Sequence, residues 1–273
     1  MSRQPNPVPL TYSHFADAYD DLGNVRSCWT VHANTIRATL KLKDTHRTIV
    51  EVGCGTGTAL AQLASQSPSP AKFVGIEPAP RMRQRAITLT SHLPNVTILD
   101  GAFEQLPLER SSADYMFSID AFHWVTNLSE AMNEMARVLK PSGEMDHFFN
   151  GSHVGWEFIR ATTPVYVKYM GLRKLVEAAK LRRQFTREEA RVLFSAAFGP
   201  ERVEVEEVHK TYFDTIEGHL GWWVRVAPQL VAIPAEQRDE CDREVRTALA
   251  ALGTREGIPY TIHQLHVRVG ATR

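Results

Sequence analysis

The feature that most limits the possible folds is a regular alternation of short apolar segments with helical ones between residues 46 and 150. The apolar segments span 48–53, 72–77, 96–100, 114–119 and 144–149. The clearest helical patterns between them span 58–64, 81–92 and 129–139. Strands that alternate with helices at this spacing form a parallel sheet through right-handed crossovers. The pattern predicts an α/β, Rossmann-like, doubly wound sheet.

The flanking segments complete this sheet and cover it. Two helical patterns precede it, at 11–22 and 26–42, after a proline-rich arm of ten residues. Residues 151–185 are rich in aromatic side chains and lack a strand signal, which predicts a helical insertion. Later patterns predict helices at 186–198, 215–226 and 235–252 and strands at 202–213 and 259–269. We expect seven strands with an antiparallel last strand, and a helical lid. The expected parts are 1–45 (lid segment), 46–150 (core), 151–185 (substrate lid) and 186–273 (completion of the sheet).

Composition excludes several classes of protein. Lys plus Arg and Asp plus Glu both number 31 in the 273 residues, so the basic balance that usually accompanies nucleic-acid binding is missing. Three scattered cysteines predict neither a disulfide framework nor a zinc ribbon. No metal is expected, because His263 and His266 in one strand would face opposite sides. The N-terminus lacks a signal-peptide pattern and no apolar run could span a membrane, so we expect a cytoplasmic protein without a membrane partner.

The stretch Glu51-Val52-Gly53-Cys54-Gly55-Thr56-Gly57 carries the strongest chemical signal, because it follows the first strand and opens a helix. Glycines there permit a tight turn and let a ligand approach the backbone closely. The spacing is G-x-G-x-G, which differs from the dinucleotide fingerprint G-x-G-x-x-G. Glu77 ends the second strand, where its carboxylate can accept both hydroxyls of a ribose. These residues predict a site for an adenosine-type ligand.

With these motifs, residues 12–150 resemble the class I S-adenosylmethionine (SAM)-dependent methyltransferases, in particular the small-molecule branch (methyltransferase type 11/25-like). Similar stretches are 75–82, 101–107, 118–124, 136–143 and the N-terminal F-A-D-A-Y-D at 15–20. The resemblance implies that Glu51 and the glycine turn hold the methionine part of SAM and that Tyr19 closes over it. The family often has Asp where this chain has Ala102, so the contact to the adenine amino group departs from the family pattern. The implied cofactor-binding residues are Tyr19, Glu51, Gly53, Cys54, Gly55, Gly57, Glu77, Pro78, Met82, Gly101, Ala102, Phe103, Ile119 and Asp120.

Methyl transfer from an activated donor depends mainly on alignment of the reactants, and it needs a general base only if the acceptor must lose a proton. His123, just past the fourth strand, is the candidate base; a capping role is the alternative. The candidate substrate-binding residues are Phe122, Trp124, Trp156, Tyr166, Trp222 and Trp223. Trp222 and Trp223 are helical neighbours about 100° apart, so at most one should face the ligand. The basic run between Lys168 and Arg187 is either a solvated face or a region that attracts an anionic acceptor.

The sequence therefore predicts a methyltransferase that uses SAM, yields S-adenosylhomocysteine and acts on a small organic molecule, as a monomer or homodimer. The acceptor atom stays open. The His-Trp ending resembles relatives of trans-aconitate methyltransferase, which favours oxygen, and the two helices between the last strands resemble histamine N-methyltransferase, which favours nitrogen. Alternatives are C-methylation of a carboxylate or diphosphate metabolite, or structural use of SAM. The Asn/Asp-Pro-Pro-aromatic stretch of many base-methylating enzymes is missing after the fourth strand, and the glycine spacing disfavours a nicotinamide oxidoreductase.

Overall fold

A seven-stranded sheet with the order β3-β2-β1-β4-β5-β7-β6 organises the molecule. The computed structural model describes residues 6–20, 26–67, 70–226 and 233–271. The strands are β1 (Thr48–Val52), β2 (Lys72–Ile76), β3 (Val96–Leu99), β4 (Ala113–Ile119), β5 (Leu139–Asn150), β6 (Val203–Asp214) and β7 (Ile258–Val269). β1 to β5 pair in parallel, and β7 runs antiparallel to both β5 and β6. The predicted sheet, including its antiparallel last strand, is confirmed.

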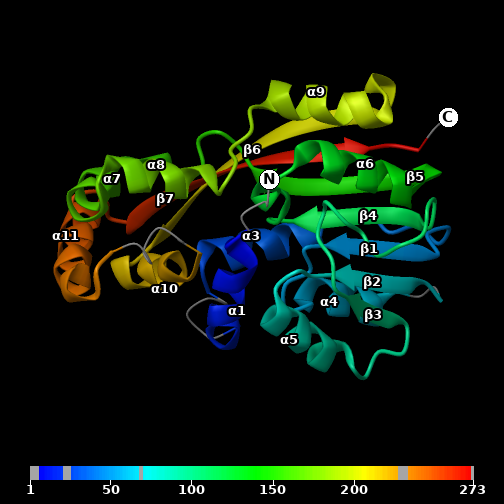
Figure 1. Ribbon diagram of the computed structural model, residues 1–273, viewed down its shortest axis with the longest axis horizontal. Helices are drawn as coiled ribbons and strands as arrows, with labels where there is room; N and C mark the ends of the chain where they lie inside the picture. The colour runs from blue at the N-terminus through cyan, green and yellow to red at the C-terminus, as the bar shows by residue number, and fades with distance from the viewer. Residues whose placement is uncertain (1–5, 21–25, 68–69, 227–232, 272–273) are drawn as a thin grey trace, which may run out of the picture.

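Helices cover both faces of the sheet (Figure 1). α4 (Thr58–Gln66) buries Leu60 against Phe73 and Phe117 on one face, and α5 (Pro80–Thr90) lies beside it. α6 (Leu128–Val138) and α9 (Arg187–Phe198) bury Met135 and Phe194 against the opposite face. Opposite faces follow from the topology, since right-handed crossovers lead outward in two directions from the central pair β1 and β4.

The long strands β6 and β7 extend beyond the rest of the sheet towards a second helical group (Figure 1). This group contains α7 (Trp156–Met170), α8 (Leu172–Lys180), α10 (Ile216–Val226) and α11 (Arg238–Ala250). Its apolar core joins Phe158 of α7, Trp222 of α10 and Tyr260 of β7. Residues 151–185 are thus helical as predicted, and their role as a separate lid stays a prediction. In the described part of the chain, no helix is both long and apolar enough to cross a lipid bilayer.

The N-terminal helices differ from the predicted ranges: α1 begins earlier than predicted, and α3 is shorter. α1 spans Val8–Tyr19 and α3 spans Cys28–Arg37, where the sequence patterns extended over 11–22 and 26–42. α1 begins early because the Asn6 side chain accepts a hydrogen bond from the Val8 N–H at 3.0 Å. α3 begins at Cys28 because Ser27 caps it by accepting from the Thr30 N–H. Pro9 therefore lies in the first turn of α1, and positions 21–25 lie outside the described residues.

β5 is the largest departure from the predicted boundaries. The sequence predicts a helix over 129–139, a turn at Pro141 and Gly143 and then a strand from residue 144; the structure has β5 beginning directly after α6, at Leu139. Ala113 pairs with Leu139 and Tyr115 with Glu144, so residues 140–143 form an irregularity in the ladder. Such an irregularity tolerates Pro141, because proline has no N–H to donate to a regular ladder.

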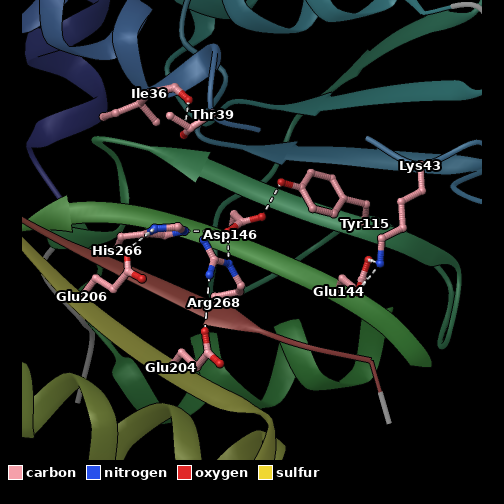
Figure 2. Close-up of polar contacts among 10 residues, drawn as sticks. All are labelled: Ile36, Thr39, Lys43, Tyr115, Glu144, Asp146, Glu204, Glu206, His266 and Arg268. Carbon is pink, nitrogen blue, oxygen red and sulfur yellow. Dashed lines mark hydrogen bonds and ion pairs between the residues drawn. The ribbon is translucent and has the colours of Figure 1, made fainter. Parts of the chain in front are cut away.

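A polar cluster occupies the face of β5, β6 and β7 that α9 leaves open (Figure 2). Asp146 accepts hydrogen bonds from the Tyr115 hydroxyl at 2.6 Å and from His266 Nε2 at 2.5 Å. Burial raises the pKa of Asp146, but the hydrogen bonds from His266 and Tyr115 outweigh this and hold it below its usual range. His263, by contrast, stacks on His209 at 4.0 Å between ring centroids. His263 and His266 thus face opposite sides of β7, as their spacing predicts.

Candidate functional site

The crevice at the carboxyl ends of β1 and β4 is where the strand order reverses direction, the usual position of a ligand in an open α/β sheet. A cavity of about 270 Å³, here called the crevice cavity, occupies it. Residues from the turn after β1, the ends of β2 and β4, and α1 surround this cavity. Its lining is Asn6, Val8, Pro9, Tyr12, Tyr19, Val52, Gly53, Gly55, Glu77, Pro78, Met82, Ala102, Phe103, Glu104, Ile119, Asp120, Ala121, Trp124, Val125 and Thr126.

The glycine turn has a backbone that L-residues with side chains rarely adopt. Gly53 and Gly55 have φ values of +75° and +56°. A Cβ on Gly53 would lie 2.3 Å from the Cβ of Ala121, so no side chain fits there. The turn needs glycine for both its conformation and its close packing, which is the physical basis of the sequence motif.

Backbone N–H groups hold the Glu77 side chain in place at the end of β2. Its Oε2 accepts from the Gly55 N–H and its Oε1 from the Ala79 N–H, both at 2.9 Å. Burial raises the pKa of Glu77, and these two hydrogen bonds act in the opposite direction. Each oxygen keeps a lone pair for a further donor, such as a ribose hydroxyl.

The structure brings most of the predicted cofactor-binding residues together but not all of them. The residues that line the crevice cavity are Tyr19, Gly53, Gly55, Glu77, Pro78, Met82, Ala102, Phe103, Ile119 and Asp120. Those outside its lining are Glu51, Cys54, Gly57 and Gly101. Glu51 is buried beneath the turn, where burial raises its pKa to about 8 and its Oε2 has no hydrogen-bond partner.

α1 closes the crevice on the side of α5, through contacts that the sequence reasoning missed. Ala16 packs against Ala79 and Met82, and Arg81 forms an ion pair with Asp17. Asn6, Val8 and Pro9 also line the crevice cavity, although the sequence pattern indicates a loose arm there. No periodicity signals these contacts, because a short proline-containing stretch carries no amphipathic repeat.

A second cavity of about 140 Å³, here called the aromatic cavity, adjoins the first. The two cavities share Tyr12, Tyr19, Ile119, Asp120 and Trp124. The remaining lining residues are Trp29, Thr30, Ala33, His123, Asn150, Arg182 and Trp222. Since Asp120 and Trp124 belong to both walls, ligands in the two cavities would lie next to each other.

Asp120 is held by a chain of buried hydrogen bonds that starts on β7. Gln264 Nε2 donates to Asp120 Oδ1 at 2.7 Å, so the Gln264 Oε1 accepts from His32 Nε2 at 3.1 Å. His32 Nδ1 then accepts from the Tyr212 hydroxyl at 2.9 Å, which fixes the His32 tautomer. Asp120 itself has a φ of +56°, an uncommon conformation for a residue other than glycine.

The environment of Asp120 also sets its proton affinity. Burial raises the pKa of Asp120 to about 7, while the hydrogen bond from Gln264 acts to lower it. A carboxyl group with a pKa near the working pH is suited to accept a proton in a reaction.

His123, the candidate base from the sequence, lies in the aromatic cavity and is buried. Burial, together with the charge of Arg182, lowers the pKa of His123 well below its usual value. His123 is therefore neutral near pH 7, and a low pKa makes it a weak base. Its catalytic role stays a prediction.

The predicted substrate-binding residues separate into three environments. Trp222 lines the aromatic cavity, and Trp124 lines all three cavities. Trp156, Tyr166 and Trp223 line a third cavity of about 390 Å³, here called the outer cavity, which lies between α7 and α8. Phe122 lines none of the three; it packs in the core against Phe149 and Phe194. The neighbours Trp222 and Trp223 thus line different cavities.

In the described part of the chain, one group of side chains could hold a metal ion by its geometry, because its ligand atoms lie within 4.8 Å of one another. The group consists of Glu207, His209 and His263. His263 Nδ1, however, accepts a hydrogen bond from the His153 N–H at 3.1 Å. The neutral ring then carries its proton on Nε2 and offers no free lone pair. We propose no metal there.

Comparison with known proteins supports the chemistry that this site indicates. Residues 50–145 match the family described as a methyltransferase domain. An uncharacterized methyltransferase-like protein of Schizosaccharomyces pombe is 33% identical over 102 residues, which are 37% of this chain and 38% of that protein. A dimethylglycine N-methyltransferase of Parasynechococcus marenigrum is 31% identical over 118 residues, 42% of each chain. The chain matches about two fifths of the length of these curated relatives.

Solved structures share the fold over nearly the whole chain. The YcgJ protein of Bacillus subtilis has a TM-score of 0.60 and 14% identity, covering 89% of this chain and all of that one. A SAM-dependent methyltransferase of Thermotoga maritima has a TM-score of 0.54 and 20% identity, covering 97% of this chain and all of that one. The match of residues 50–145 to a methyltransferase domain, the G-x-G-x-G turn and the sheet order together support a class I SAM-dependent methyltransferase.

Proposed function

We propose that the protein transfers the methyl group of SAM to a small organic molecule bound in the aromatic cavity. The observation that carries this proposal is the shared wall between the two cavities. Asp120 and Trp124 border both the crevice, where the family fold places the cofactor, and the aromatic cavity beside it. Two ligands held this way would lie next to each other, which is the main requirement of an alignment-driven reaction.

The residues of the crevice fit SAM. Glu77 keeps lone pairs for the ribose hydroxyls, and Gly55 leaves room for the ligand beside Met82. The buried Glu51, whose Oε2 has no partner, lies beneath the glycine turn and supports the end that would receive the methionine part. When bound, SAM supplies a methyl group on a positively charged sulfur, which keeps the electron pair of the C–S bond as that bond breaks.

Asp120 is the general base in this proposal. A neutral hydroxyl or protonated amine must lose a proton before or during methylation, and Asp120 lies between the two cavities with a pKa of about 7. The hydrogen bond from Gln264 orients its carboxylate and leaves the second oxygen free for the acceptor proton. The acceptor atom is accordingly nitrogen or oxygen; the N-methyltransferase among the relatives supports nitrogen.

The test is isothermal titration of the purified chain with S-adenosylhomocysteine, with NAD as the control ligand. We expect micromolar binding of S-adenosylhomocysteine and none of NAD. Incubation with SAM and a panel of small amines, alcohols and acids should then release S-adenosylhomocysteine with at least one acceptor. Binding without release for any acceptor would favour structural use of SAM, and no binding at all would refute the proposal.

A further inference from the structure

Arg182 is the basic residue in the lining of the aromatic cavity, as far as the chain is described. It follows α8, and its N–H donates to the Ala179 carbonyl, which places the residue at the C-terminal end of that helix. The same side chain borders the outer cavity. Arg182 therefore borders both the aromatic cavity and the outer cavity, and it is not part of the crevice lining.

Three other basic side chains of this segment do not line the aromatic cavity and have partners elsewhere. Lys168 pairs with Glu244, and Arg173 pairs with Glu177. Arg183 donates to the Val125 carbonyl. For Arg182, no carboxylate lies within ion-pair distance in the described part of the chain. A partly buried guanidinium without a counter-ion favours an anionic ligand.

Buried polar atoms around the same cavity also lack partners. Asn150 Oδ1 and Trp222 Nε1 have no hydrogen-bond partner among the residues that the structure describes, and each residue is only 1% exposed. An unsatisfied buried polar group costs about 1–3 kcal/mol. A polar ligand that supplies an acceptor for Trp222 and a donor for Asn150 would remove this cost.

The wall of the aromatic cavity therefore contains both an acidic and a basic side chain. Asp120 belongs to its border with the crevice, and Arg182 to its border with the outer cavity. We propose that Arg182 binds a carboxylate of the methyl acceptor while the reacting amine or hydroxyl lies at Asp120. The acceptor is then a small amino or hydroxy acid, methylated at nitrogen or at the hydroxyl oxygen. This inference rests on the proposed function, because it assigns the acceptor of that same site.

The experiment measures binding of acceptor probes to protein already saturated with S-adenosylhomocysteine. If S-adenosylhomocysteine itself does not bind, the proposed function fails before any acceptor probe is tested. The probes are three carboxylates: sarcosine, anthranilate and salicylate. Each is compared with the amide in which its carboxylate is replaced by an uncharged carboxamide: sarcosinamide, anthranilamide and salicylamide. We expect at least one acid to bind about tenfold or more tightly than its amide, as a charge-assisted pair predicts. No acid binding, or equal binding of acid and amide, would overturn the proposal.

Variants assign the preference to a residue. R182Q should abolish the preference for the acid, and R182K should retain part of it, because lysine keeps the charge but not the two-pronged geometry. R173Q is the matched control, since Arg173 has the same charge and lies in the same segment but is 92% exposed. Unchanged affinity of R182Q for S-adenosylhomocysteine would show that the variant folds. A preference that survives in R182Q, or a product identified as a methyl ester, would contradict the assignment.

Discussion

Two carboxyl groups at the crevice, Glu77 and Asp120, are both buried but are held in different ways. Both oxygens of Glu77 accept backbone N–H groups, whereas one oxygen of Asp120 accepts a side-chain amide. Backbone donors stabilise the charged carboxylate in a fixed position. Glu77 thus suits binding, and Asp120 suits proton transfer.

Glu77→Ala should weaken S-adenosylhomocysteine binding. The loss of a hydrogen-bonded carboxylate is worth about 1.5–3 kcal/mol, or about tenfold or more in the dissociation constant. Glu77→Gln should weaken it as well, because its NH₂ would face one of the two backbone donors. Titration calorimetry measures both, with the exposed Glu256→Ala as control; wild-type affinity in both Glu77 variants would contradict the ribose assignment.

Asp120→Asn should lower the methyl-transfer rate by about 10²–10⁴-fold with little change in cofactor affinity. Asparagine keeps the shape, tolerates the positive φ and can still pair with Gln264. The exposed Asp239→Asn is the control. If the variant kept the full rate, Asp120 would not be the base.

The pH dependence separates Asp120 from His123. Because the pKa of Asp120 is about 7 and its deprotonated form accepts the proton, the wild-type rate should rise between about pH 6 and about pH 8. The lowered pKa of His123 predicts no inflection in that range. Initial rates at saturating SAM would show which profile holds, and a flat profile would favour His123 or no base.

At the scale of elements, α1 is joined to α5 by buried apolar contacts and by ion pairs near the solvent. Arg81 pairs with Asp17, and Arg85 pairs with Asp20 at 3.1 Å. Such exposed pairs contribute about 0.2–1 kcal/mol each and are screened by salt. α1 carries Tyr12 and Tyr19 over both cavities, so these pairs couple ionic strength to cofactor retention.

The double variant Asp17→Asn, Asp20→Asn should therefore bind S-adenosylhomocysteine about two- to tenfold more weakly at low salt. The difference from wild type should shrink between about 50 mM and about 500 mM NaCl. Glu188→Gln, which removes the ion pair with Arg191 on the distant α9, serves as the control. Equal affinities of the double variant and the wild type at low salt would mean that α1 is held by its apolar contacts alone.

At the scale of the whole molecule, the cofactor site joins elements that are far apart in the first half of the chain. α1, the turn after β1 and the end of β4 meet around one cavity. A ligand that binds the native state alone should stabilise it by about 2.7 kcal/mol at a hundredfold excess over its dissociation constant. Thermal unfolding should show a higher Tm with S-adenosylhomocysteine, and no shift with NAD; equal Tm values with and without saturating S-adenosylhomocysteine would contradict the site.

The sequence by itself determined the order of strands and helices and the place of the crevice. Short-range periodicity reports which residues are strands, and a glycine turn after the first strand reports where the backbone bends sharply. Both signals come from residues close together in the sequence, so they can be recognised without knowledge of the tertiary structure. The boundaries of the elements depend on tertiary contacts as well. β5 begins early, at Leu139, because ladder pairing with β4 overrides a local turn signal.

Only the tertiary structure decided which polar groups surround the aromatic cavity. The chain of hydrogen bonds from Asp120 through Gln264 to His32 joins residues 144 and 232 positions apart. Arg182 meets Asn150 and Trp222 across three elements, and Phe122, beside His123 in sequence, lies in the core instead. Burial, proton affinity and the lack of a counter-ion depend on what packs around a side chain, which no local pattern encodes.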